Sequence, residues 1–205
     1  MDVYKETGHA DVAAVAARLV VEDGLEYGAA KRRAVKQLGL NARAALPDNA
    51  VLEAAVRDYI AVFCPESQAQ ELRVLRQLAL LWMDRLVAFR PHLGGAVWQG
   101  TATRHSDIYL RLYCDDPKAA EFALLDHRVE YHPGTVDSGR GEPVPTLTLR
   151  VRCEPLGQWV LVHLMVHDLD ELRGALKPDA QGRKPRGDAV AVRALLAAPE
   201  ATPWA

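Results

Sequence analysis

The period of the hydrophobic pattern changes near residue 91, and this change limits the folds that the chain can adopt. Before it, apolar residues recur every three or four positions, as in residues 49–63 and 66–90, which is the period of a helix buried along one face. After it, residues 106–114 alternate between apolar and polar side chains, which is the period of a strand. We therefore expect a bundle of helices followed by a sheet.

The pattern divides the chain into a helical region of residues 1–91 and an α/β region of residues 92–205. Helices followed by a sheet with its own helices indicate an α+β protein. No Gly/Ser-rich linker separates the two regions, so we expect the N-terminal helical bundle to pack on the mixed β-sheet as one compact unit. In the second region we expect a helix over residues 117–127, strands near 129–132, 146–153 and 158–167, and a glycine-bearing loop over 133–145.

The composition indicates a cytoplasmic globular protein. Of the 205 residues, 49% are hydrophobic and 25% are charged, which is ordinary for a globular chain. The three cysteines, Cys64, Cys114 and Cys153, are odd in number and form no Cys-x-x-Cys pair, as expected of reduced thiols. The longest apolar stretches, such as residues 78–82, are too short to cross a membrane, so we expect no membrane partner.

The formal net charge of -2 gives no overall attraction to nucleic acid, so a contact with RNA would need a local basic patch. One candidate is the run Lys31-Arg32-Arg33 with Lys36, and the other is the connector that contains Arg183, Lys184 and Arg186. Basic side chains of this kind contact phosphates in nucleic-acid-binding proteins. They also occur on ordinary solvated helix faces, and the sequence leaves both interpretations open.

Residues 94–110 combine a glycine turn with an acidic strand start. Gly94 and Gly95 end a short strand, a polar loop follows, and a serine with Asp107 opens the alternating strand. Along that strand the apolar side chains point to one face, while Asp107 and Tyr109 point to the other. The turn and the start of the strand are therefore the candidate site. The alternative is a simple turn before a half-buried strand, without any chemistry.

This segment resembles the DNA polymerase β-like nucleotidyltransferase superfamily, especially its small minimal members, in which a Gly-Ser turn precedes Ser-Asp-x-Asp-Leu at about this distance. The resemblance implies a nucleotidyltransferase-like α/β domain that binds an NTP together with Mg²⁺ or Mn²⁺. In such a site the glycine turn lets backbone amides approach the triphosphate, and paired carboxylates hold the metal ions. The roles implied are catalysis and metal binding for Asp107 and Glu130, and nucleotide binding for Gly94, Gly95, Arg104, Ser106 and Arg111.

Two positions depart from the pattern of this superfamily. Gly95 stands where serine is usual, which removes a hydroxyl ligand for phosphate but still permits the turn. Tyr109 stands where the second carboxylate is usual, and a phenol with a pKa of about 10 is neutral at pH 7 and binds Mg²⁺ poorly. For the third acidic position, Glu130 is the candidate on the strand after the helix, while the strand near residues 158–167 offers His163 at a comparable place.

Three functions remain open at this stage. The first is an enzyme that transfers a nucleotidyl group from an NTP to an acceptor such as RNA, a protein side chain or a small hydroxyl or amine compound. The second is a catalytically inactive relative that binds a nucleotide or a partner protein, as in toxin-antitoxin pairs that join a small member of the superfamily to a helical partner. The third is a helical interaction module whose α/β half is only structural.

The histidines offer a separate possibility. His163 and His167 lie four residues apart on an expected strand, so they share a face with Met165 between them. Together with His132 they could bind a transition metal, because imidazole is a common ligand of such ions. Histidines near strand ends more often make structural hydrogen bonds, and no recognised ligand spacing is present.

Overall fold

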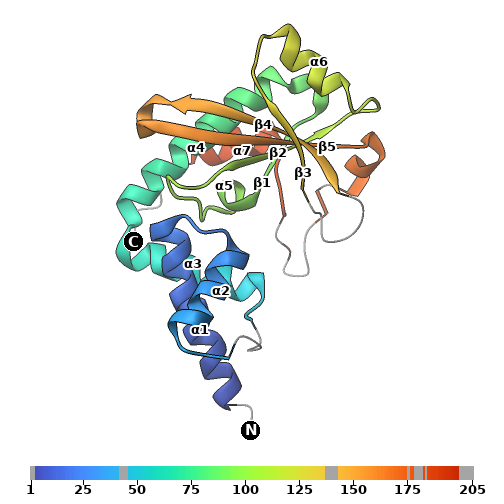
Figure 1. Cartoon of the computed structure of the whole chain (residues 1–205). Helices are drawn as coiled ribbons and strands as arrows, with labels where there is room; N and C mark the ends of the chain where they lie inside the picture. The colour runs from blue at the N-terminus through green and yellow to red at the C-terminus, as the bar shows by residue number, and fades with distance from the viewer. Residues whose placement is uncertain are drawn as a thin grey trace. The chain divides into compact units, whose positions relative to one another are not determined.

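The computed structural model describes residues 3–41, 46–136, 143–174, 176–177, 182 and 184–198 (Figure 1). It contains two compact units, residues 1–69 and residues 70–205, and each has a hydrophobic core of its own. The boundary lies within helix α4 (Pro65–Arg85), whose later turns belong to the second core. Among the described residues, no helix combines the length and the apolar character that crossing a membrane requires.

The first unit contains three helices, α1 (Val3–Asp23), α2 (Tyr27–Gln37) and α3 (Asn49–Phe63). Asp48 starts α3 because its side chain accepts a hydrogen bond from the amide of Val51, which would otherwise lack a partner in the first turn. The core of the unit is made by the apolar stripes that the sequence predicts, with Leu19, Leu52 and Val56 fully or almost fully buried.

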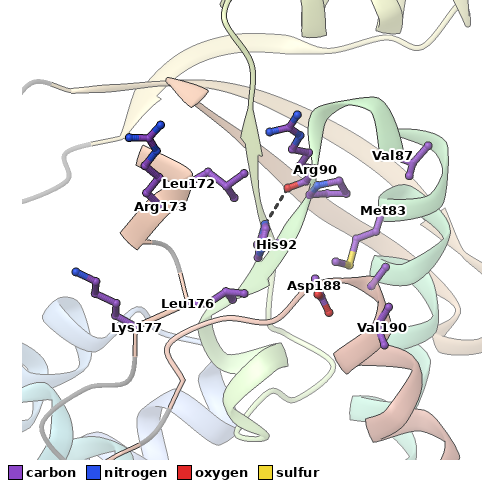
Figure 2. A pocket seen from close by; sticks show the side chains of 12 residues that line it. Met83, Val87, Arg90, His92, Leu172, Arg173, Leu176, Lys177, Asp188 and Val190 are labelled. Carbon is purple, nitrogen blue, oxygen red and sulfur yellow. Dashed lines mark hydrogen bonds between the residues drawn. The ribbon is translucent and has the colours of Figure 1, made fainter. Parts of the chain in front are cut away.

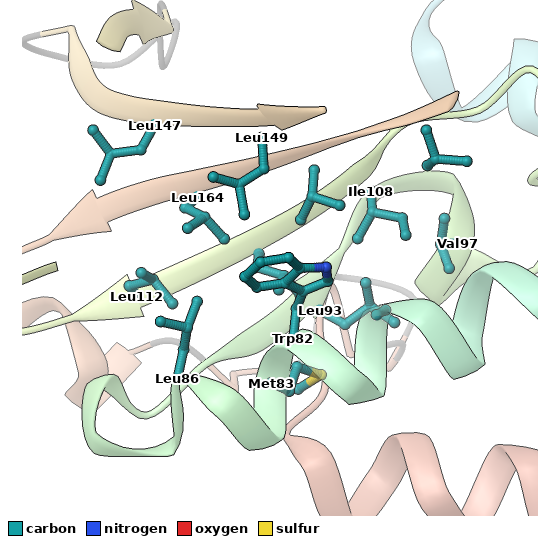
Figure 3. Packing of buried hydrophobic residues seen from close by; sticks show 14 of the residues in the cluster. Trp82, Met83, Leu86, Leu93, Val97, Ile108, Leu112, Leu147, Leu149 and Leu164 are labelled. Carbon is teal, nitrogen blue, oxygen red and sulfur yellow. The ribbon is translucent and has the colours of Figure 1, made fainter. Parts of the chain in front are cut away.

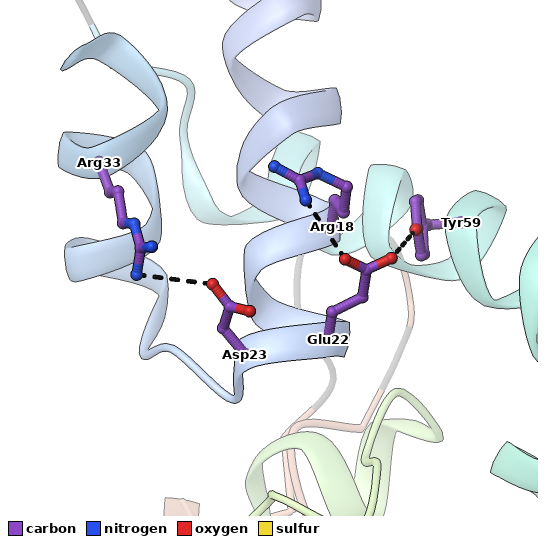
Figure 4. A network of polar contacts seen from close by, with 5 residues as sticks. All are labelled: Arg18, Glu22, Asp23, Arg33 and Tyr59. Carbon is purple, nitrogen blue, oxygen red and sulfur yellow. Dashed lines mark hydrogen bonds and ion pairs between the residues drawn. The ribbon is translucent and has the colours of Figure 1, made fainter. Parts of the chain in front are cut away.

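Polar contacts tie the same three helices together (Figure 4). Glu22 accepts hydrogen bonds from Arg18 and from the Tyr59 hydroxyl of α3, while Asp23 forms an ion pair with Arg33 of α2. Lys31 is buried, and its ammonium donates to the Pro47 carbonyl at 2.8 Å and to Asn49 Oδ1 at 2.7 Å. Two members of the basic run near residue 31 therefore have structural partners. Arg32 and Lys36 remain exposed.

The second unit is built on a five-stranded mixed sheet with the order β1-β2-β5-β4-β3. Strands β2 and β5 are parallel, and all other neighbours are antiparallel. The expected α+β class is thus confirmed. The strands are β1 (His92–Gly94), β2 (Ile108–Tyr113), β3 (His132–Val136), β4 (Val144–Cys153) and β5 (Gln158–His167). The helices after α4 are α5 (Gly95–Gln99), α6 (Ala119–Asp126) and α7 (Ala189–Ala197), with 3₁₀ turns η1 (Val87–Phe89), η2 (Glu154–Leu156) and η3 (Leu169–Gly174).

The two faces of the sheet differ in chemistry. The apolar face carries the alternate residues Ile108, Leu110 and Leu112 of β2, which are fully buried. In Figure 3 the indole of Trp82 from α4 lies among these side chains and their neighbours on β4 and β5. The opposite face, which we call the polar face, carries Tyr109, Arg111 and Tyr113 of β2, His163, Met165 and His167 of β5, and Thr146 and Thr148 of β4.

The region around β3 differs from the expectation. Strand β3 begins at His132 and continues to Val136, within the expected loop, whereas the predicted strand near residues 129–132 is not formed. Pro133 and Gly134 suggested a loop, but an edge strand tolerates both because one of its sides needs no hydrogen-bonding partner. Residues 137–142 of the expected loop, like Arg183 in the basic connector, lie outside the described residues.

A single β-bridge joins Gly187, in the segment before α7, to Leu93 of β1. Leu93 and Gly187 exchange two backbone hydrogen bonds, of 2.8 and 3.0 Å, and the indole of Trp98 donates to the Lys184 carbonyl at 2.8 Å. A Cβ atom on Gly187 would lie 2.2 Å from two ring carbons of Trp98. The close approach of the indole therefore requires glycine at this position.

We expect Gly187→Ala to lower the free energy of unfolding by about 1–3 kcal/mol, the usual loss when a packed site receives an extra carbon. Chemical denaturation monitored by tryptophan fluorescence measures this change. Gly134→Ala is the matched control, because Gly134 also lies in the sheet region but has nothing within 4 Å of its added Cβ. Equal losses in the two variants would contradict the packing argument.

Candidate functional site

The candidate site is a row of side chains that crosses the polar face. Backbone register pairs Gly94 with Tyr109, Tyr109 with His163, His163 with Thr148, and Thr148 with His132. The row therefore joins all five strands. It brings the glycine turn to β2, as the sequence predicts, and it also places His132 two strands away from His163, with Thr148 between them.

Asp107 immediately precedes β2 and binds His163. Its Oδ2 atom lies 3.1 Å from His163 Nε2, and His163 Nδ1 lies 3.0 Å from the Thr148 hydroxyl oxygen. A carboxylate oxygen only accepts, so Nε2 carries the proton; in the neutral ring Nδ1 then accepts from the hydroxyl of Thr148. The Tyr109 ring stacks on the imidazole with a centroid distance of 4.8 Å. His163 is thus held from three sides.

The glycine turn packs directly on this group. Gly95 has a φ of 65°, a conformation that residues with a side chain rarely adopt, and its added Cβ would lie 3.4 Å from the Tyr109 ring. The short helix α5 that follows is held by Arg76 of α4, whose guanidinium donates to the carbonyls of Val97 and Trp98. The sequence did not predict this helix. The turn is nevertheless where the superfamily resemblance expects it, beside the start of β2.

The ligands that a Mg²⁺ pair needs are not assembled here. Mg²⁺ requires several hard oxygen ligands in octahedral geometry. In this row Asp107 is the one carboxylate, one of its oxygens already accepts from His163, and Tyr109 and His163 occupy the places beside it. Within the described part of the chain, no group of three or more His, Cys, Asp or Glu residues could hold a metal ion. These residues do not fit the metal site that the resemblance implies.

The row contains a chain of hydrogen bonds. A hydroxyl, an imidazole and a carboxylate are connected in series through Thr148, His163 and Asp107, an arrangement that also occurs in sites where an imidazole acts as a base. The side chains of His163 and Asp107 are 15% and 31% exposed, respectively, so the pair remains accessible to a bound molecule.

The other residues that the sequence predicts for the site are mostly engaged elsewhere or lie away from Asp107. Glu130 is exposed and lies two residues before β3, which is separated from β2 by β4 and β5 in the sheet, and no contact joins it to Asp107 among the described residues. The Ser106 hydroxyl accepts from the Thr103 amide, and Arg104 donates to the Leu156 carbonyl. Arg111 alone among the predicted cations lies on the polar face, two residues along β2 from Tyr109.

Arg111 belongs to a polar cluster that the sequence did not reveal, in which Arg111 and Arg186 are half-buried and His167 is buried. Its neighbours are Arg186, which donates to the Tyr113 hydroxyl at 3.0 Å, and His167, whose Nδ1 donates to Glu171 at 3.0 Å. Burial, reinforced by the charge of Arg186, lowers the pKa of Arg111. Among the described residues no carboxylate lies within ion-pair distance of the Arg111 guanidinium, and none accepts from His167 Nε2, which is buried.

Alternation along β2 places Tyr113 on the same face as Tyr109, so that member of the cluster could have been found from the sequence. Arg186 could not, because it comes from a connector whose path is set by the contact between Gly187 and Trp98.

No protein-family model matches the chain, and neither does any curated protein. One solved structure that is similar is described as "Structure of Cid1 in complex with the UTP analog UMPNPP". The match has a TM-score of 0.36 and 14% sequence identity, and it covers 54% of this chain. The matched part spans 37% of the length of the Cid1 chain.

We expect the folded protein to lose stability as the pH falls from about 7.5 to about 5.5, in part because of His167. Burial lowers the pKa of His167, with an opposing contribution from its hydrogen bond to Glu171. The unfolded chain therefore takes up a proton at higher pH than the folded chain does, and stability decreases as the pH falls through the ordinary histidine pKa of about 6.5.

His167→Gln should reduce this pH dependence, which denaturant unfolding at a series of pH values measures. His127→Gln, at an exposed histidine, serves as the control and should leave the slope as it is in the wild type. An unchanged slope in His167→Gln would contradict the assignment.

Proposed function

We propose that this chain is a nucleotidyltransferase-like protein that binds a nucleotide on the polar face without metal-dependent nucleotidyl transfer. The observation that carries the proposal is the pair of Asp107 and His163 beside the Gly94–Gly95 turn. In an active site of the kind that the sequence resembles, metal-bound carboxylates occupy this place. Here an imidazole donates to the remaining carboxylate, and a phenol stacks on that imidazole.

The energetics favour binding without metal. Placing Mg²⁺ beside Asp107 would require the ion to compete with the His163 donor for the carboxylate, and it would leave the ion with a single anionic protein ligand. The His163 proton already reduces the negative potential of Asp107. The positive charge that an anionic ligand needs is supplied by Arg111 on the same face rather than by a bridging metal ion.

Cations and aromatic rings supply the contacts that a nucleotide needs. The half-buried Arg111 guanidinium has no described carboxylate partner, and a guanidinium in a partly desolvated site forms strong bidentate hydrogen bonds with phosphate. Further along the same face the exposed Trp159 lies under the Arg150 guanidinium, which is 4.6 Å from the centroid of its ring. Aromatic faces with neighbouring arginines are typical platforms for nucleobases.

We expect one or more of ATP, GTP, CTP and UTP to raise the melting temperature of the protein equally in EDTA and in Mg²⁺, because a ligand of the folded state stabilises it. Arg111→Gln should lose about tenfold or more in nucleotide affinity, the effect of removing one charge-assisted contact, and Arg111→Lys should recover part of it. Arg128→Gln, at an exposed position after α6, should bind nucleotide like the wild type.

The same samples distinguish nucleotide binding alone from nucleotidyl transfer. Incubation with α-labelled NTP and total cellular RNA or protein detects any transferred nucleotidyl group. Nucleotide binding that needs Mg²⁺, together with label transfer that Asp107→Ala abolishes, would replace the proposed function by nucleotidyl transfer. A protein that no nucleotide stabilises would leave only a structural role for the polar face.

A further inference from the structure

A cavity lies at the start of β1, away from the glycine turn. It has a volume of about 790 Å³, within the size range of small-molecule sites. Its walls come from the end of α4, from η1 and β1, from η3 and the residues after it, and from the start of α7. Figure 2 shows Met83, Val87 and Val190 on one side and Leu172, Arg173, Leu176 and Lys177 on the other.

Most of the lining is apolar, and part of it is exposed to an unusual degree. Met83 is fully buried at the base, whereas Val87 and Val190 are 69% and 73% exposed, and Leu176 is 38% exposed. Large apolar side chains scattered singly over a surface need no explanation, but here three of them border one cavity. An apolar ligand body would cover them and gain the free energy of their removal from water.

The charged side chains of the cavity are mostly cations. Arg90, Arg173 and Lys177 line it, and none of them forms an ion pair with a described residue. Asp188 is the one carboxylate in the lining, and its Oδ1 is engaged because it accepts the Ala191 amide at 2.9 Å as the cap of α7. Among the lining residues, uncompensated positive charge therefore surrounds an apolar interior.

Arg90 and His92, at the edge of the cavity, are held in defined conformations. Arg90 has a φ of 48°, a left-handed conformation that non-glycine residues rarely adopt and that tends to persist where surrounding structure enforces it. Its carbonyl accepts from His92 Nδ1 at 2.8 Å, so the proton of the ring is on that nitrogen. Burial lowers the pKa of His92, and the neutral ring presents an acceptor rather than a charge.

We propose that this cavity binds a small amphipathic anion, with an apolar body against Met83, Leu172 and Val190 and a carboxylate or phosphate head near Arg90, Arg173 and Lys177. The ligand class follows from the lining, because neither a neutral hydrocarbon nor a cation would use these unpaired cations. The cavity shares no residue with the row around Asp107, although His92 of its lining pairs with Arg111 across β1 and β2; the experiments below therefore measure anion binding and nucleotide binding separately.

Four probes with the same ten-carbon chain test the class of ligand by isothermal titration below their micellar concentrations. Decanoate and decyl phosphate carry anionic heads, decanol is neutral, and decyltrimethylammonium is cationic. The proposal expects saturable binding of at least one anion, and binding of decanol and of the cation at least about tenfold weaker. The preferred head group then distinguishes a carboxylate site from a phosphate site.

Matched variants at Val190 locate the binding. This side chain is 73% exposed, so both Val190→Glu and Val190→Lys can fold, and melting curves verify that they do. One added charge at the rim should weaken anion binding about two- to fivefold in the Glu variant and should not weaken it in the Lys variant. The pair Arg173→Gln and Lys177→Gln should lower anion affinity together by about five- to tenfold. Arg128→Gln, outside the cavity, should leave it unchanged.

Three results would overturn the proposal. The first is equal binding of the anion, the alcohol and the cation, which would indicate a non-selective apolar patch. The second is anion binding that is indifferent to both Val190 variants, or no saturable anion binding at all. The third is ATP binding that weakens in Val190→Glu, because the nucleotide would then occupy this cavity. Tyr109→Asp alters the row around Asp107 and not the cavity. ATP binding that weakens in Tyr109→Asp but not in Val190→Glu therefore supports the proposed nucleotide site.

Discussion

The in-register parallel pairing of β2 with β5 is the constraint on which the polar face depends. Parallel pairing puts Tyr109 beside His163, and it does the same for Arg111 with Met165 and for Tyr113 with His167. The alternate residues of both strands meet on the apolar face, where Ile108 and Leu110 are buried against α4. A slip of one residue would exchange these two sets, so burial of the apolar set fixes the position of the polar one.

Once the register is fixed, the chemistry of the row follows from which side chains meet. His163 lies within hydrogen-bonding distance of Asp107 on one side and of Thr148 on the other, and both ring nitrogens are engaged. A carboxylate at position 163 would repel Asp107 unless a cation lay between them. An imidazole at this position instead donates a hydrogen bond to Asp107 and adds no negative charge. This difference is the physical reason why Asp107 needs no bridging cation between itself and its neighbour on β5.

The sequence predicts the parts of this site that depend on local periodicity. Alternation in residues 106–114 places Asp107 and Tyr109 on one face, and the glycine pair places the turn beside them; both relations are present in the sheet. The choice between Glu130 and His163 could not be made in the same way, because it depends on which later strand pairs with β2. The chain passes β3 and β4 first and inserts β5 next to β2, a crossover that no local pattern encodes.

Mn²⁺ binding measured by electron paramagnetic resonance tests whether the hydrogen bond from His163 keeps Asp107 from binding a divalent metal. We expect the wild-type protein to leave the signal of free Mn²⁺ unchanged at low millimolar concentrations. We also expect the double variant Tyr109→Asp, His163→Asp to remove free Mn²⁺ stoichiometrically, because its two new carboxylates join Asp107 at the start of β2 and on the neighbouring position of β5. Stoichiometric Mn²⁺ binding by the wild type that Asp107→Ala abolishes would contradict this role of His163.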